Sequence, residues 1–163
     1  MKSRSLSFIG FCLFSASTQL SANPVNPENQ TNMQIEEIVH SIIATLESGW
    51  NTGNGAEFAR PFADISQFTD IRGTFHQNAS PKALGEAHQG LFMSIYKGSK
   101  VTYQLVQASQ IDDNTILANV SAALDAPSGP LAGKNSSAIT MVITKTGEEW
   151  KIKAFHNTLV INR

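Results

Sequence analysis

Asp70 has the surroundings that an acid–base catalyst needs. It lies in segment 66–72, whose alternation is typical of a strand and places Phe68, Asp70 and Arg72 on one face. A carboxylate on the pocket face of a strand, near apolar groups, has a raised pKa and can move protons. Three roles stay open for Asp70: general base, polar group of a ligand pocket, or structural partner of Arg72. Pairing with Arg72 would keep Asp70 ionised, and binding without catalysis would then be favoured.

Two histidines could share the site with Asp70. His88 falls on the apolar stripe of an expected helix, where a hydrogen-bonded core histidine is the alternative. His156 shares its strand parity with Ile152, so we expect it to face the same cavity. If either histidine is the partner of Asp70, the charged pair could move protons near neutral pH. His76 lies in a loop, at the cavity mouth or in solvent.

The spacing of these residues gives no sign of a metal or cofactor site. Asp70, His88 and His156 are too far apart in the sequence to match a known short metal-binding motif. The chain also lacks a glycine-rich nucleotide fingerprint and the Gly-x-Ser-x-Gly turn of serine hydrolases. We therefore expect neither a cofactor nor a metal ion.

Aromatic residues are expected to line a pocket around these groups. Most aromatic side chains at helical spacing pack in a core, but some must form the wall of any cavity. The expected lining comprises Trp50, Phe68, Arg72, Phe92 and Tyr96. A pocket with aromatic walls and few polar groups suits a small, mostly apolar organic molecule.

The elements that position these residues follow from hydrophobic periodicity. Apolar residues at helical spacing predict a long helix over 35–50, a short helix around Phe58, and a third helix after the Ser80-Pro81 start signal. Period-two alternation then predicts four strands, over 101–109, 115–124, 137–145 and 150–160. This order indicates an α+β fold: a curved antiparallel sheet wrapped around the long N-terminal helix, with about three helices and a cone-shaped cavity.

Composition limits the class of protein. The 163 residues suit one domain, and the formal net charge of −1 gives no basic surface for nucleic acid. Hydrophobic residues make up 41% of the chain, yet no apolar run has the length of a membrane span. We expect a globular domain that binds neither nucleic acid nor membrane.

The N-terminus has the pattern of a secretory signal peptide. Residues 1–22 combine early basic residues, a short apolar stretch and a small residue, Ala22, before the expected cleavage site. The predicted organisation is a signal peptide over 1–22, a flexible polar leader over 23–31, and the folded domain over 32–163, in the periplasm or secreted. The single cysteine, Cys12, leaves with the signal, so we expect no disulfide.

Several short motifs resemble a known family. Phe62-Ala63-Asp64, Phe68-Thr69-Asp70 and Gly73 resemble the strand entry of SnoaL-like proteins, in the nuclear-transport-factor-2-like superfamily. The ending Trp150-Lys-Ile-Lys-Ala-Phe-His-Asn-Thr158 resembles the SgcJ/EcaC branch of that superfamily. The resemblance covers most of the chain after the leader. It implies a cone fold and a dimeric habit, whereas activities in this superfamily vary widely.

The resemblance also bears on the role of Asp70. Counted from Phe62, Asp70 falls where ketosteroid isomerase, of the same superfamily, carries its general base. The position of that enzyme's tyrosine oxyanion donor holds Leu46 here, and its later acidic donor would fall near Thr140. Since oxyanion stabilisation usually contributes most to such catalysis, the same reaction is not expected.

Three functions remain open at this point. The first is a secreted homodimer that binds a small apolar molecule in the cone. The second is an isomerase, dehydratase or hydrolase with Asp70 as base and His88 or His156 as partner. The third is a non-catalytic association module with a vestigial pocket. The homodimer is expected to form through the outer face of the sheet, where Phe155 should be exposed.

Overall fold

A computed structural model of the chain describes residues 27–161 and contains, within that range, three helices. They are α1 (Pro27–Thr52), α2 (Gly55–Ala59) and α3 (Pro81–Met93). α1 begins before the helix predicted over 35–50 and before the predicted domain start at 32, so the end of the predicted leader is helical, while the expected signal peptide lies outside the described residues. No helix in the described range is long and apolar enough to cross a membrane.

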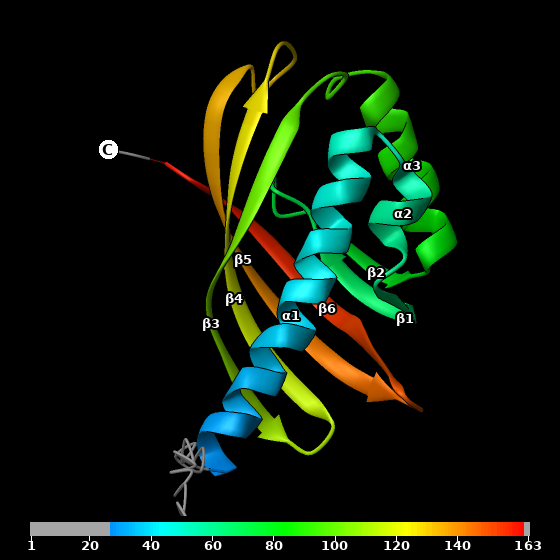
Figure 1. The fold of residues 1–163 in the computed structure, drawn as a ribbon. Helices are drawn as coiled ribbons and strands as arrows, with labels where there is room; N and C mark the ends of the chain where they lie inside the picture. Colours follow the sequence, from blue (N-terminus) through cyan, green and yellow to red (C-terminus); the bar gives the residue numbers. More distant parts are fainter. Residues whose placement is uncertain (1–26, 162–163) are drawn as a thin grey trace, which may run out of the picture.

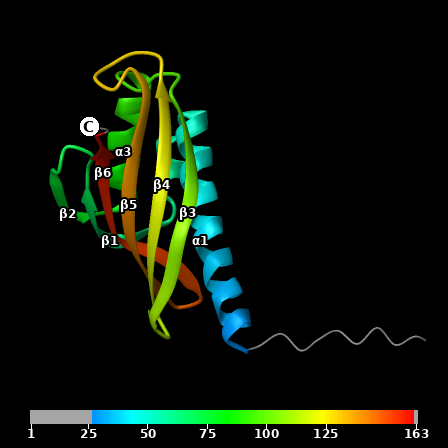
Figure 2. The same cartoon turned by 90° about the vertical axis from the view of Figure 1, so that its left-hand side faces the viewer.

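Six strands form one curved sheet on which the helices pack (Figure 1). Figure 2 shows them side by side in the order β2-β1-β6-β5-β4-β3. Their bounds are β1 (Phe62–Thr69), β2 (Phe75–Ala79), β3 (Lys100–Asp112), β4 (Thr115–Ala126), β5 (Gly133–Thr146) and β6 (Glu149–Val160). The α+β cone fold predicted from the sequence is therefore confirmed.

The sheet is mixed rather than fully antiparallel. β3, β4, β5 and β6 form the expected antiparallel series, joined by short turns and one longer loop. β1 lies parallel to β6, which is possible because a long stretch of chain, with α3 and four strands, comes between them. β2 pairs with β1 as the edge strand and was not foreseen from the sequence.

β1 is displaced from the segment expected for it. The strand spans 62–69 instead of 66–72, and Asp70 is the first residue after it. The carboxylate of Asp70 accepts the backbone N–H groups of Arg72 (2.9 Å) and Thr74 (3.0 Å). An aspartate that bonds the backbone just ahead of it favours a turn over a continued strand. The chain therefore reverses here into β2.

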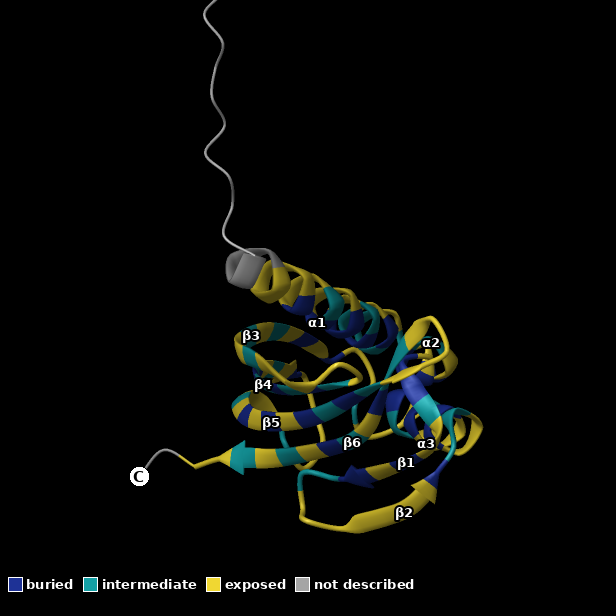
Figure 3. Cartoon of the chain, turned by 90° about the horizontal axis from the view of Figure 1, so that it is seen from below, coloured by how far each residue is buried: buried dark blue, intermediate teal, exposed yellow. Residues whose placement is uncertain are grey.

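The core lies between α1 and the concave face of the sheet. In Figure 3 the strands form a curved row and the helices all lie on one side of it. α1 contributes Val39 and Leu46, which are almost fully buried, and the sheet contributes Met141, Ile143 and Ile152. α1 runs along the length of the sheet, and α2 and α3 lie together beside its C-terminal half (Figure 1).

A β-bulge in β6 decides which of its side chains face inward. Ile152 and Ala154 pair with consecutive residues of β5, so Lys153 has no partner. Because side chains alternate with a period of two, one extra residue exchanges the faces beyond it. Phe155 is 3% exposed and points into the fold, whereas His156 is exposed on the outer face. Both orientations are opposite to those expected from the sequence, which assumed a regular strand.

Candidate functional site

A cavity of about 670 Å³ lies inside the cone, between α3, the end of α1 and the concave face of the sheet. The loop between β4 and β5 closes part of its rim through Pro130 and Leu131. Its wall is largely aromatic and aliphatic. The aromatic members are Trp50, Phe58, Phe68, Tyr96, Tyr103 and Phe155. A lined hollow of this size and character is typical of a site for a small organic molecule.

The end of α1 is fixed tightly beside this cavity. The side-chain amide of Asn51 bonds to both the backbone N–H and the carbonyl of Val101, at 2.8 and 2.9 Å. The indole N–H of Trp50 donates to Ser99 Oγ at 3.0 Å. Trp50 therefore presents only its apolar ring to the cavity, and the wall on this side is rigidly placed.

The opposite wall depends on two stacked phenylalanines. Phe68 of β1 and Phe155 of β6 are register partners on parallel strands. Their rings lie 5.1 Å apart at an interplanar angle of 4°, a stacked arrangement. Such a pair contributes about 0.5–1.5 kcal/mol beyond burial of its area. It also gives the cavity a flat apolar surface.

The aromatic residues expected in the pocket are only partly found there. Trp50, Phe68 and Tyr96 line the cavity as predicted. Phe92 does not, because it is buried behind the wall and packs against Trp50 with ring centroids 5.1 Å apart. It supports the indole instead of meeting a ligand.

His88 lies in the wall as a deeply buried imidazole, 6% exposed. Its ring stacks on Phe58 with centroids 4.1 Å apart and meets the edge of Phe68 at 5.5 Å. Its Nδ1 lies 2.8 Å from the carbonyl oxygen of Leu84, one helical turn earlier. A carbonyl only accepts hydrogen bonds, so Nδ1 carries the proton and Nε2 keeps its lone pair.

Burial lowers the pKa of His88 to about 4, although the hydrogen bond to Leu84 acts in the opposite direction. Inside this aromatic cage, a protonated imidazole would have neither water nor a counter-ion around it, so the charged form is costly. His88 is therefore neutral at physiological pH. It is a hydrogen-bonded core histidine that also lines the cavity.

Asp70 lies at the rim of the cavity and its carboxylate is already occupied. Besides the bonds from the two backbone N–H groups, the carboxylate accepts a hydrogen bond from Arg72 Nη2 at 3.2 Å and lies 3.4 Å from His76 Nε2. Partial burial would raise the pKa of Asp70, but the backbone bonds from Thr74 and Arg72, with the Arg72 and His76 side chains, together lower it to about 2. An aspartate with so low a pKa is a weak base near neutral pH.

The expected meeting of Asp70, His88 and His156 does not occur. Asp70 bonds to Arg72 and His76, at the rim, and His88 lies deeper in the wall without it. His156 is on the far side of the sheet because of the bulge in β6. Among residues 27–161, no three His, Cys, Asp or Glu side chains are grouped as a metal site requires.

Asn157 and Tyr103 line the cavity and were not singled out from the sequence. Asn157 enters because the bulge turns it inward with Phe155. Tyr103 lies on β3, and burial raises the pKa of its hydroxyl, as does the nearby Glu47 carboxylate. The alternation of β3 could have pointed to Tyr103, whereas the sequence holds no signal for the bulge that places Asn157.

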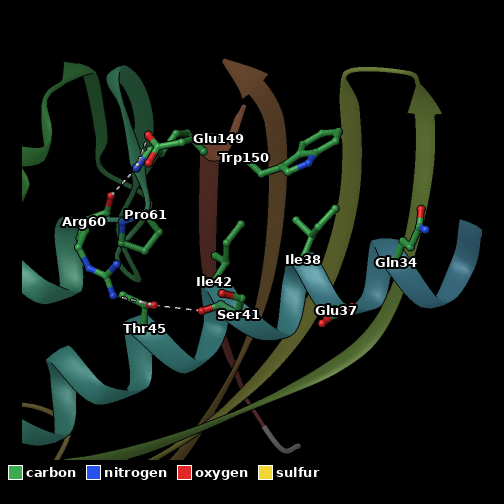
Figure 4. Close-up of a pocket in the computed structure, with 11 residues that line it drawn as sticks. Gln34, Glu37, Ile38, Ser41, Ile42, Thr45, Arg60, Pro61, Glu149 and Trp150 are labelled. Carbon is green, nitrogen blue, oxygen red and sulfur yellow. Dashed lines mark hydrogen bonds and ion pairs between the residues drawn. The ribbon is translucent and has the colours of Figure 1, made fainter. Parts of the chain in front are cut away.

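A second hollow, a groove of about 580 Å³, lies between the middle of α1 and the turn from β5 to β6 (Figure 4). Its polar groups are largely bonded to one another. Arg60 donates to Thr45 Oγ1 at 3.3 Å, and Lys151 lies 3.3 Å from Glu149 while also donating to the Arg60 carbonyl. The cone cavity, which contains a buried imidazole with a free nitrogen, is the stronger candidate site.

The buried state of His88 predicts a pH-dependent stability. Its pKa is about 4 in the folded chain and 6.5 as a free side chain, so the unfolded state binds the extra proton first as pH falls. The free energy of unfolding should therefore be highest above pH 6.5 and fall by about 2 kcal/mol between pH 6.5 and 5, where carboxylates stay ionised. Urea unfolding at several pH values measures this change.

The matched control is His88→Phe, which keeps an aromatic ring against Phe58 but does not titrate. This variant should lose the His88 component of the pH slope, whatever its absolute stability. Identical slopes for the two proteins would show that His88 is not the buried neutral group inferred here.

Comparisons with known proteins agree with the fold. No protein-family model matches the chain, and no curated protein matches it in sequence. A domain of unknown function with a cystatin-like fold from Nostoc punctiforme is similar in structure, with a TM-score of 0.70, 22% identity, and coverage of 79% of each chain. An NTF-2 like protein of unknown function from Shewanella oneidensis has a TM-score of 0.64 and 11% identity, covering 76% of this chain and 98% of that one.

A third similar structure has an enzyme's name. It is a putative scytalone dehydratase from Novosphingobium aromaticivorans, with a TM-score of 0.65 and 11% identity, covering 82% of this chain and 89% of that one. At such identities the likeness concerns the fold alone. The chain has the cystatin-like fold of nuclear-transport-factor-2-like proteins.

Proposed function

We propose that this protein binds a small, mostly apolar organic molecule in the cone cavity. The observation that carries the proposal is an unfilled, aromatic-walled cavity of about 670 Å³ with a neutral histidine in its wall. Burial of an apolar ligand there contributes about 25 cal/mol for each Å² removed from water. The resemblance of the sequence motifs to SnoaL-like proteins supports the cone that encloses this cavity, and it does not specify the ligand.

An enzyme is the second candidate, and the base would be His88 rather than Asp70. Nε2 of His88 is unprotonated and faces the cavity, whereas the carboxylate of Asp70 is held by Arg72. An isomerase or dehydratase reaction begins with proton removal, for which the neutral imidazole has a lone pair. Its pKa of about 4 makes His88 a weak base, though a stronger one than Asp70 with a pKa of about 2. A bound molecule that changes chemically during incubation with the protein would favour this candidate over simple binding.

An association module with a vestigial pocket is the least supported of the three functions. Vestigial pockets are expected to fill with side chains, because close packing stabilises a core. Here the cavity is open and its polar wall groups face inward.

Filling the cavity should abolish binding of an apolar probe. Ala122 lines the cavity from β4, while the adjacent Ala123 is exposed on the outer face of the sheet. Ala122→Phe should therefore weaken binding of the neutral fluorescent probe N-phenyl-1-naphthylamine at least tenfold, since the added ring occupies the ligand's space. Fluorescence titration measures the dissociation constant.

Ala123→Phe makes the same substitution on the other side of the sheet and should leave probe affinity unchanged. Thermal unfolding of both variants checks that the fold is kept. Failure of the wild-type protein to bind the probe, or equal binding by both variants, would contradict ligand binding in the cone.

We further propose a homodimer formed through the outer face of the sheet. The reason given by the sequence, an exposed Phe155, is wrong, since that ring is buried. The outer face instead carries, across the middle of the strands, a row of uncharged polar residues in which Gln107 donates to Asn119 and Asn119 donates to Thr140, each at 3.1 Å. Thr140 is the register partner of His156 on the next strand. No helix of the described chain covers this row, which a second copy could cover symmetrically.

Placing a charge in this row should separate the two copies. Thr140→Arg is expected to convert a dimer into a monomer at micromolar concentration. The two introduced guanidinium groups, one from each copy, would face each other near the two-fold axis and lose their hydration. Sedimentation velocity measures the mass. A wild-type protein that is monomeric at these concentrations would overturn the proposal.

Export is proposed from the N-terminal sequence alone. The basic start, short apolar stretch and Ala22 favour cleavage between Ala22 and Asn23, with the mature protein in the periplasm or secreted. Mass spectrometry of protein isolated from its native host should find a chain that begins at Asn23. A mature chain that retains Met1–Ala22 would exclude this processing.

A further inference from the structure

Two polar groups in the cavity wall lack a partner within the protein. In the described part of the chain, Asn157 Oδ1 is the one fully buried side-chain oxygen or nitrogen without a hydrogen bond. His88 is bonded at Nδ1 only, and its ring lines the cavity, so Nε2 is open toward it. More than nine in ten buried polar groups in native proteins are satisfied, so the unpaired Asn157 Oδ1 needs an explanation, and Nε2 of His88 offers a second acceptor to a molecule in the cavity.

Both atoms are acceptors. Nε2 of His88 has a lone pair because the proton is on Nδ1, facing the Leu84 carbonyl. The free atom of Asn157 is its amide oxygen. Acceptors can be satisfied only by an O–H or N–H group, so a molecule that fills the cavity without a donor would leave both unsatisfied.

Residues 27–161 give the cavity no unpaired fixed cation with which to hold an anion. Among those of them that line the cavity, only Arg72 and Asp70 have a fixed charge, and they pair with each other at 3.2 Å. Arg72 is also 80% exposed at the rim, away from the buried imidazole. A carboxylate near His88 would bring an acceptor against an acceptor and would be stripped of water, which is strongly unfavourable.

We propose that the ligand is a neutral, ring-containing molecule with a hydroxyl or N–H group, and that this group donates to Nε2 of His88. The inference rests on the proposed binding function and adds the class of ligand. The stacked pair of Phe68 and Phe155 and the indole of Trp50 provide flat apolar walls for a ring. The donor then bonds to Nε2 in the plane of the imidazole, where the lone pair lies, while Phe58 stacks on a face of the ring.

Three naphthalene probes of similar shape test separately whether the ligand needs a donor and whether it must be neutral. 2-Naphthol is neutral with a donor, 2-methoxynaphthalene is neutral without one, and 2-naphthoate is an anion. Calorimetry on the full chain should show 2-naphthol binding on the order of tenfold more tightly than 2-methoxynaphthalene, the worth of one buried hydrogen bond. 2-Naphthoate should bind most weakly of the three.

His88→Phe is the matched variant, because it keeps a ring against Phe58 and removes the acceptor. It should abolish the preference for 2-naphthol while leaving the affinity for 2-methoxynaphthalene within about twofold, since apolar burial is kept. If this variant does not fold, nitrogen NMR of the wild-type protein replaces it. The Nε2 resonance of His88 should then move toward the protonated range with 2-naphthol but not with 2-methoxynaphthalene.

The outcomes distinguish this inference from the function on which it rests. Equal affinity for 2-naphthol and 2-methoxynaphthalene would overturn the donor requirement, although the cavity would still bind apolar molecules. Preference for 2-naphthoate would overturn neutrality and assign ligand recognition to Arg72. If neither these probes nor N-phenyl-1-naphthylamine bind, the proposed function itself fails.

Discussion

The extra residue in β6 determines what the cone contains. Lys153 has no register partner on β5, and the strand beyond it turns its other face to the cavity. Phe155 then stacks on Phe68, and Asn157 enters the wall instead of His156. In a regular strand an imidazole would face inward here and two apolar groups would face the solvent. The aromatic wall and the polar character of the cavity therefore both depend on one irregularity of register.

In this cavity the charged groups and the neutral hydrogen-bonding groups lie in different places. The charged groups, Asp70 and Arg72, pair at the rim, where the carboxylate also closes the turn between β1 and β2. Deeper in the wall the polar groups are neutral, because burial among aromatic rings lowers the pKa of His88 to about 4. An interior of this kind favours molecules that bring donors without charge. It disfavours Asp70 as a base, since a pKa of about 2 gives it little affinity for a proton near neutral pH.

The sequence predicted elements well and side-chain directions less well. Helical periodicity located α1, and the Ser80-Pro81 signal located α3, where Ser80 Oγ accepts the Ala83 N–H. Alternation located β3 to β6, and Trp50, Phe68 and Tyr96 lie in the cavity wall. Alternation failed where tertiary pairing changed it: at the bulge in β6, and at Asp70, whose backbone bonds end β1. Phe92 was misplaced because a helical stripe does not distinguish a cavity wall from the layer behind it.

An open cavity persists in a fold that could pack more closely. An open cavity and a buried acceptor without a partner, Asn157 Oδ1, both reduce stability, and larger side chains at positions such as Ala122 would fill the cavity. Nothing in the packing of α1 or α3 requires the hollow, since Trp50 and Phe92 already fill the space between those helices. Local features that oppose stability without a structural benefit are expected where a protein meets its ligand. The open acceptor of His88 and the unpaired oxygen of Asn157 are therefore the physical basis for proposing a ligand that brings a donor.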